Sequence, residues 1–350
     1  MKAIKIYNYG SSEEFKYEET PVPEIKDNQI LVKVYATSIN RIDEKIASGD
    51  MSNQFHLQFP WTPGYDFAGI VDSIGRNVTE FKVGDEVYGN SSGGCFAEFV
   101  AADEEKTVKK PEILSFVEAS SVPHVAETAW QAAHTHGNLH PCQRILIHGA
   151  AGAVGAYAVQ FAKASNAYVF ATASAADLDF LKSLGADVVI DYKNQDFTQK
   201  ANNLDLVLDF VGGETQKRSY PLIRKGGKLV STVDMNTEDE AKKYNVIPVL
   251  MMIRHNAADL EIITRMINDG KVKTDVASVY PLKDANLAWD NYFNTDIAQP
   301  SNPHGKVVLQ VVDDSNWEDI YGQDEKDPEN PLHQDGITDQ PLLSEWQEGE

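Results

Sequence analysis

The chain has 350 residues, enough for two domains, and its hydrophobic fraction of 42% is ordinary for a protein with a sizeable core. Its formal net charge is −22, of which −12 falls in residues 313–350, and no apolar run approaches membrane-spanning length, which argues against nucleic acid and membranes as main partners. Its two cysteines, Cys95 and Cys142, cannot form a disulfide framework or a four-cysteine zinc lobe, so we expect a reducing, cytoplasmic setting.

Residues 1–120 have the pattern of a β-rich region. Short alternating or continuous apolar runs are separated there by glycines and prolines, which is typical of strands joined by turns. The strands are expected at 2–7, 30–35, 68–75, 83–89 and 95–101.

From about residue 120 the pattern changes to alternating strands and helices. A helix is expected at 128–134, then a buried strand at 145–147, a glycine-rich turn and a helix from 156. Further strands are expected at 167–172, 188–191, 205–211 and 228–232, and further helices at 175–184 and 214–223. This alternation predicts a parallel, doubly wound sheet.

The chain then returns to β character. A helix at 257–268 precedes β segments at 279–281 and 306–312. We therefore expect a β-rich domain at 1–122 that is completed by 272–312, with a nucleotide-binding domain inserted at 123–271. Residues 313–350 are expected to be an acidic tail, either a solvated extension or a strap that docks on the body or on another subunit.

The turn after the buried strand carries Gly149, Gly152 and Gly155. Glycines in a strand–turn–helix unit let the backbone approach a dinucleotide pyrophosphate, which then sits on free N–H groups at the helix N-terminus. The spacing differs from the commoner form because Ala150 holds the usual first glycine position. A plain tight turn is the competing interpretation.

The end of the next strand bears on the choice of cofactor. An NAD site usually places a carboxylate about 20 residues past the glycines to bind the ribose 2′-OH. Here the strand ends as Phe170-Ala171-Thr172-Ala173-Ser174, without a carboxylate, which leaves room for a 2′-phosphate and favours NADPH. The carboxylate of Asp177 would repel a 2′-phosphate and thus disfavours NADPH, unless it forms a capping box with Ser174. NADH therefore stays the alternative.

Several ordered motifs over about 1–312 resemble the zinc-independent medium-chain dehydrogenases/reductases of the quinone oxidoreductase (zeta-crystallin-like) type. They are Ser38-Ile39-Asn40-Arg41-Ile42-Asp43, Pro63-Gly64-Tyr65-Asp66-Phe67-Ala68-Gly69, Val83-Gly84-Asp85-Glu86-Val87, Thr128-Ala129, the glycine turn, Gly185-Ala186-Asp187, Ile190-Asp191-Tyr192, Asp209-Phe210-Val211-Gly212-Gly213 and Gly305-Lys306-Val307-Val308. The resemblance implies a GroES-like β-rich catalytic domain plus an inserted Rossmann domain, an active site between them, and a homodimer.

The resemblance also implies site residues. Asn40 and Thr128 are expected near the nicotinamide and the substrate, where Asn40 donates to a developing oxygen or, alternatively, only caps a helix at 41–47. Tyr65 either lines the cleft or fills space, Lys45 stands where relatives often show an aromatic residue, and Asp43 is expected to pair with a neighbour. The expected cofactor-binding residues are Gly149, Ala150, Ala151, Gly152, Ala153, Val154, Gly155, Ser174, Tyr192, Val211, Gly212 and Gly227, the last three at strand ends over the ribose and nicotinamide.

No catalytic metal is expected. Zinc-using members of the wider group carry cysteine and His-Glu ligands, whereas this chain has Gly64-Tyr65-Asp66 at the His-Glu position and no cysteine near 38–40. A second cluster, His134, His136, His140 and Cys142, has ligand-like spacing, but its place at the end of a helix favours a structural role.

These features predict an NADPH-dependent reductase that transfers hydride to a small electrophile, either a quinone or an activated alkene such as an enone or enal. One alternative is a non-catalytic NADPH-binding sensor or interaction protein, suggested by Trp317 and Trp346 in the tail. Another is a zinc alcohol dehydrogenase with atypical ligands.

Overall fold

The computed structural model describes residues 1–234, 237–293 and 304–312, and residues 1–312 form one compact unit. The predicted acidic tail therefore lies outside the described residues. Among the residues described, no helix is both long and apolar enough to cross a lipid bilayer.

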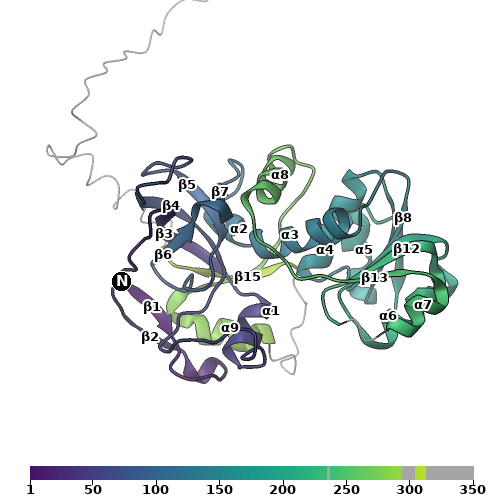
Figure 1. Cartoon of the computed structure of the whole chain (residues 1–350), viewed down its shortest axis with the longest axis horizontal. Coiled ribbons are helices and arrows are strands. Elements are labelled where there is room, and N and C mark those ends of the chain that lie inside the picture. Colours follow the sequence, from purple (N-terminus) through teal and green to yellow (C-terminus); the bar gives the residue numbers. More distant parts are fainter. Residues whose placement is uncertain (235–236, 294–303, 313–350) are drawn as a thin grey trace, which may run out of the picture. The chain divides into compact units, whose positions relative to one another are not determined.

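A six-stranded parallel sheet forms the middle of the chain (Figure 1). Its strands, in spatial order, are β10 (Val188–Asp191), β9 (Tyr168–Ala173), β8 (Arg144–His148), β11 (Leu204–Asp209), β12 (Ile223–Ser231) and β13 (Ile247–Leu250). This is the doubly wound order 3-2-1-4-5-6, and the order reverses between β8 and β11. The predicted doubly wound parallel sheet is confirmed.

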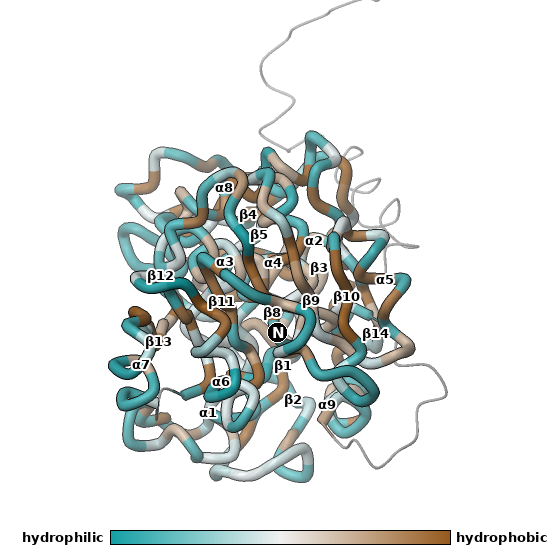
Figure 2. The backbone as a smooth tube through the Cα atoms, turned by 90° about the vertical axis from the view of Figure 1, so that its right-hand side faces the viewer, coloured by the Kyte–Doolittle hydropathy of each residue, from teal (hydrophilic) through white to brown (hydrophobic). Residues whose placement is uncertain are grey.

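The apolar pattern of β8 explains why this sheet is covered on both faces. Ile145 and Ile147 belong to one core cluster and Leu146, between them, belongs to another, because successive side chains of a strand point to opposite faces. In Figure 2, strands β9 to β11 are largely brown, whereas helix α7 at the surface is teal.

On the first face, helix α4 (Ala153–Ala164) packs on β8 and β9, α3 (Pro123–Trp130) packs on α4, and α8 (Ala257–Asn268) packs on α3. Tyr220, just after α6 (Gly213–Ser219), and Ala241 of α7 (Glu238–Tyr244) belong to the cluster on the second face. Helix α5 (Leu178–Ser183) follows β9. The predicted helix at 128–134 is confirmed as part of a longer helical stretch, since α3 ends at Trp130 and continues as a π-helix to His136.

A second, seven-stranded sheet is mainly antiparallel. Its strands are β14 (Val276–Pro281), β15 (Lys306–Gln310), β3 (Gln29–Ser38), β4 (Asp66–Ile74), β5 (Glu86–Asn90) and β7 (Thr107–Lys109), with β6 (Phe99–Asp103) also paired to β3. Strand β1 (Lys2–Lys5) pairs with β2 (Lys16–Glu19), and helices α1 (Arg41–Ala47), α2 (Phe116–Ser120) and α9 (Ala285–Phe293) accompany this sheet.

The strands of this second sheet come from segments that precede the parallel sheet in the sequence and from segments that follow it. β15 pairs with β3, so that Val308 lies opposite Ser38. This pairing agrees with the expected discontinuous β-rich region, while the boundaries at 122/123 and 271/272 stay predictions.

Candidate active site

The glycine turn connects β8 to α4. Gly149 has φ +71°, which favours glycine, and Gly152 is the N-cap of α4. A Cβ on Gly155 would lie 2.2 Å from the Gly149 carbonyl oxygen and 2.6 Å from Ala150 Cα. Helix and strand therefore approach as closely as only a glycine permits, as in a dinucleotide-binding turn.

A cleft of about 1010 Å³ opens at the end of this turn. It lies at the carboxyl ends of β8 and β9, and β14 contributes Ala277, Ser278 and Tyr280 to the opposite wall. The parallel sheet binds ligands at such ends, next to the point where the strand order reverses. Gly149 and Gly152 both line this volume, which therefore lies where a glycine turn binds a nucleotide pyrophosphate.

The cleft brings together seven of the expected cofactor-binding residues and leaves out five. Those that line it are Gly149, Ala151, Gly152, Ala153, Ser174, Tyr192 and Val211. Ala150, Val154, Gly155, Gly212 and Gly227 are not among its lining residues. Ala150 is fully buried, and the backbone N–H groups of Val211 and Gly212 both donate to the buried Asp209 carboxylate.

The expectation for Gly227 is wrong. It lies within β12 rather than in a turn before it, and its neighbour Lys228 pairs with Leu206 and Ile247 near the amino ends of their strands. The carboxyl end of β12 is Ser231, about 13 Å further along the strand. Gly227 is thus remote from the edge where the glycine turn lies, and instead a Cβ there would clash with Ile223 Cγ2 at 2.6 Å.

The predicted capping box at Ser174 and Asp177 does not form. Ser174 is the N-cap of a short 3-10 turn, but its hydroxyl donates to the Asp177 carboxylate at 2.5 Å instead of accepting from the backbone. His304 Nε2 lies 3.8 Å from the other Asp177 oxygen, and its ring stacks on Phe180 with centroids 3.6 Å apart. Asp177 and His304 both line the cleft.

Three cations that the sequence reasoning did not select also line the cleft: Arg41, Lys193 and Arg218. Arg218 is paired with Asp196 at 2.6 Å. Lys193 directly follows Tyr192 at the end of β10, and this adjacency is the one signal that could have found it. Lys45, one helical turn after Arg41, is exposed and outside the cleft, so its expected place in the site is wrong.

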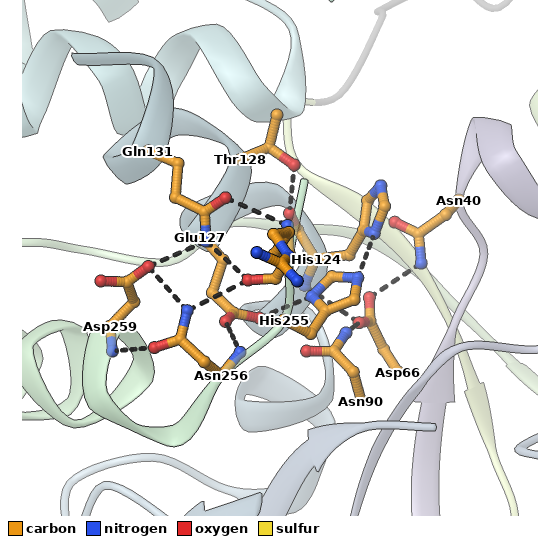
Figure 3. Close-up of polar contacts among 11 residues, drawn as sticks. Asn40, Asp66, Asn90, His124, Glu127, Thr128, Gln131, His255, Asn256 and Asp259 are labelled. Carbon is orange, nitrogen blue, oxygen red and sulfur yellow. Dashed lines mark hydrogen bonds and ion pairs between the residues drawn. The ribbon is translucent and has the colours of Figure 1, made fainter. Parts of the chain in front are cut away.

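Asn40 and Thr128 are buried below the lining of the cleft rather than on it. Asn40 Nδ2 donates to Asp66 Oδ2 at 2.8 Å, and Asn40 Oδ1 accepts from the Lys306 ammonium (Figure 3 draws Asn40 with Asp66). Thr128 Oγ1 donates to the His124 carbonyl at 2.6 Å. Tyr65 is half-buried, and burial and the nearby Asp43 raise the pKa of its hydroxyl.

Asp66 is the centre of this buried polar group. Its carboxylate accepts from four donors: Ser38 Oγ, Asn40 Nδ2, Asn90 Nδ2 and the backbone N–H of His124. Lys306 Nζ lies 3.9 Å away. A carboxylate that is saturated by donors and faces an ammonium has no free oxygen to offer a metal cation.

Asp43 confirms the expectation of a paired, structural carboxylate. It accepts from the Asn40 backbone N–H at 2.6 Å, while its Oδ1 has no hydrogen-bond partner in the described part of the chain. Burial raises the pKa of Asp43 to about 8, and burial lowers the pKa of Lys306 to about 8. The two groups therefore compete for protons in the same pH range.

The raised pKa of Asp43 gives a testable pH dependence. Between the ordinary carboxyl value of 3.8 and about 8, the folded state holds a proton that the unfolded state lacks, so this group's contribution to stability falls as pH rises. We expect Asp43→Asn to remove this pH dependence. From pH 5 to pH 8, the free energy of unfolding of the native chain should fall relative to that of the variant, by at most about 1.4 kcal/mol per pH unit. Urea unfolding at each pH measures the difference. The exposed Asp50→Asn is the matched control, and a difference that grows in the opposite direction contradicts the prediction.

The histidine cluster at 134–142 shows a structural arrangement. His134 Nε2 lies 2.9 Å from Ser165 Oγ and Nδ1 lies 3.3 Å from the Trp130 carbonyl, so both ring nitrogens have protein partners. Within the described ranges, no three His, Cys, Asp or Glu side chains are grouped so as to hold a metal ion.

Comparisons with known proteins agree with this geometry. The family model of an alcohol dehydrogenase GroES-like domain matches residues 26–112, and that of a zinc-binding dehydrogenase matches residues 184–309. The chain is 34% identical to the chloroplast envelope quinone oxidoreductase homolog of Arabidopsis thaliana, over 89% of this chain and 98% of that protein. It is 32% identical to the chloroplastic NADPH-dependent alkenal/one oxidoreductase of Arabidopsis thaliana, over 89% of this chain and 80% of that protein.

A solved structure extends the likeness to three dimensions. The Escherichia coli quinone oxidoreductase complexed with NADPH has a TM-score of 0.78 and 26% identity, over 89% of this chain and 100% of that one. These matches confirm the expected combination of a GroES-like domain with a Rossmann-like parallel sheet.

Proposed function

Because the chain belongs to the quinone oxidoreductase family of medium-chain dehydrogenases/reductases, we propose that it transfers a hydride from NADPH to a quinone or an activated alkene. The observation that carries the proposal is the glycine turn, whose close helix–strand packing aims the N-terminus of α4 into the 1010 Å³ cleft. The alternative of a non-catalytic sensor is not favoured, since these relatives are named as oxidoreductases.

We propose the following roles for the chain's own residues. The backbone N–H groups of Ala151 and Ala153 bind the pyrophosphate at the positive end of α4, while that of Gly152 donates to the Gly149 carbonyl. Val211 lies along the ribose, and Tyr192 with Lys193 receives the 2′-phosphate. Bound NADPH supplies the hydride. Asn40 holds the acceptor's oxygen through the second N–H of its amide, since the first donates to Asp66, and Thr128, whose hydroxyl proton is donated to the His124 carbonyl, contacts the acceptor without donating to it.

The absence of zinc from the reaction is also a proposal. Its support is the donor set: Tyr65 and Asp66 occupy the ligand position, and Asp66 is already saturated by four donors beside Lys306. The acceptor must then be electrophilic by itself, as quinones and enals are. Metal analysis of the purified protein tests this, and one zinc per chain would contradict it.

Turnover is tested with purified protein, NADPH and three acceptor classes: 1,4-benzoquinone, 9,10-phenanthrenequinone and 2-alkenals. Falling absorbance at 340 nm that depends on the protein is the expected result. No NADPH oxidation with any of the three would overturn the proposed function.

The position of Asp177 yields a prediction about cofactor choice. Its carboxylate lies beside Ser174 in the cleft, where it would repel a 2′-phosphate. We expect Asp177→Asn to tighten NADPH binding by about fivefold, which is roughly 1 kcal/mol of charge repulsion removed in a solvated site. NADH binding should not change. Titration of nucleotide fluorescence measures both; a variant that loses NADH affinity instead would show that Asp177 binds the ribose 2′-OH.

We further propose a homodimer and a cytoplasmic location. The dimer is supported by β13, an edge strand whose Ile247 and Leu250 are 48% and 55% exposed, followed by Met252 at 67%. Exposed apolar side chains along a sheet edge are typical of an interface. Light scattering of the native chain and of Leu250→Lys tests this, and a monomeric native protein contradicts it.

The proposed cytoplasmic location is supported by cysteine usage and can be tested by imaging.

A further inference from the structure

Three titratable side chains form a line beside the buried Asp66 group. Glu127 Oε2 lies 2.8 Å from His255 Nδ1, and His255 Nε2 lies 3.3 Å from His124 Nδ1 (Figure 3). Glu127 and His124 are on α3, whereas His255 precedes α8. A carboxyl and two imidazoles in series are the arrangement through which a proton can move by exchange of hydrogen bonds.

The Glu127 end of the line is closed. Glu127 is fully buried, and its second oxygen accepts from the Asn256 backbone N–H at 2.9 Å. Burial raises the pKa of Glu127, and burial followed by the charges of His255 and Lys306 lowers the pKa of His124 well below its ordinary value. Burial thus disfavours the charged form of both Glu127 and His124.

The His124 end is open. Within the described ranges, His124 Nε2 has no hydrogen-bond partner. Four side-chain atoms there are both shielded from solvent and without a partner: Asp43 Oδ1, Thr62 Oγ1, Asn90 Oδ1 and Tyr157 OH. His124 Nε2 is not among these four, so it is not shielded in the same way. The residue is half-buried. Its second nitrogen is therefore not fully enclosed by the protein.

His124 is hydrogen-bonded to Thr128 directly and to Asn40 through Asp66, the two residues proposed to contact the acceptor being Thr128 and Asn40. Its carbonyl accepts from Thr128 Oγ1 at 2.6 Å, and its backbone N–H donates to the Asp66 oxygen opposite the one that binds Asn40. In Figure 3 the His124 ring lies on the side of His255 where Asn40 is drawn. The unpaired nitrogen of His124 thus belongs to a residue that is hydrogen-bonded into the same buried polar group as Asn40 and Thr128.

We propose that Glu127, His255 and His124 form a relay that delivers the proton needed to complete reduction of the acceptor. This inference rests on the proposed function. Reduction of a quinone to a quinol, or of an enone to a saturated ketone, consumes one hydride and one proton. The two electrons arrive with the hydride, and the relay supplies the proton.

The relay conserves protons and charge at each step. His124 Nε2–H gives its proton to the reduced acceptor, His255 Nε2–H passes one to His124 Nδ1, and the Glu127 carboxyl passes one to His255 Nδ1. One O–H bond of Glu127 breaks and one O–H or C–H bond forms on the product. Glu127 is left as a carboxylate. After the product leaves, water protonates His124 Nε2, His124 Nδ1–H returns a proton to His255 Nε2, and His255 Nδ1–H returns one to Glu127.

The test compares His124→Ala, His255→Gln and Glu127→Gln with the native chain, using the acceptor that the native chain reduces fastest. Each variant should lower kcat by about 100-fold or more, the usual contribution of a positioned general acid. NADPH affinity should stay within about threefold, because the cleft is untouched. The double variant His124→Ala/His255→Gln should have the same kcat as the single variants, because either substitution alone already interrupts the proton path.

Chemical rescue separates proton delivery from a structural role. Added imidazole should restore turnover of His124→Ala in proportion to its concentration, which a packing role does not predict. His134→Gln, on the same stretch of chain but outside the group, is the control and should keep native kcat. Folded variants with kcat within about threefold of native would overturn the relay. If His124→Ala fails to fold, His255→Gln alone decides in the same way. A native chain that oxidises no NADPH contradicts the proposed function instead.

Discussion

Lys306→Met is expected to lower the free energy of unfolding by about 3–5 kcal/mol, the cost of leaving one partner of a buried ion pair without the other. Lys306 is almost fully buried, donates to the Ile39 carbonyl and to Asn40 Oδ1, and lies 3.9 Å from Asp66. Methionine fills a similar volume but leaves the Asp66 side chain without the ammonium that lies 3.9 Å from it. Asn40 also loses the contact that orients its amide oxygen.

Urea unfolding of native and variant chains at pH 7 measures this effect, and the thermal midpoint should fall by roughly 10 °C. Lys45→Met is the matched control, because Lys45 is exposed and should change stability by no more than about 0.5 kcal/mol. The same control tests the corrected position of Lys45, which should also keep native kcat. A Lys306→Met protein as stable as the control would show that Asp66 is not ionised in the folded state.

Gly155→Ala is expected to weaken NADPH binding by about 100-fold or more, which corresponds to roughly 3 kcal/mol. The added Cβ would lie 2.2 Å from the Gly149 carbonyl oxygen and 2.6 Å from Ala150 Cα, and both are backbone atoms that cannot rotate away. The start of α4 must therefore move off β8. The N–H groups of Ala151 and Ala153, which we propose to bind the pyrophosphate, would move with it.

Nucleotide titration of the folded variant measures the loss. Ala164→Gly is the control: it lies at the exposed end of α4 and costs about 1 kcal/mol of helix stability without touching the turn. If both variants bind NADPH like the native chain, the glycine turn does not hold the nucleotide. If both lose affinity equally, helix stability and not the close packing is what matters.

The parallel sheet and its glycine turn could be predicted because their signals are local. The apolar run at 145–147 marks a strand buried on both faces, and the three glycines mark a turn whose backbone must approach both a helix and a ligand. The strand positions at 30–35, 68–75 and 205–211 were found for the same reason, with ends displaced by a few residues. The prediction for Gly227 was wrong because two adjacent glycines are typical of a turn, whereas Gly226 and Gly227 both lie inside β12.

The polar pocket, in contrast, was decided by tertiary structure. Lys306 and Asn40 are 266 positions apart, and His255 and Glu127 are 128 apart, so no spacing in the chain relates them. They meet only because β15 returns to pair with β3 and because the segment before α8 packs on α3. The sequence by itself determined where the glycine turn lies, at which we propose that the nucleotide is held, since such a turn depends on the backbone of a few consecutive residues. Which side chains share protons beneath the cleft depends on burial and on contacts between distant segments, and only the folded chain supplies those.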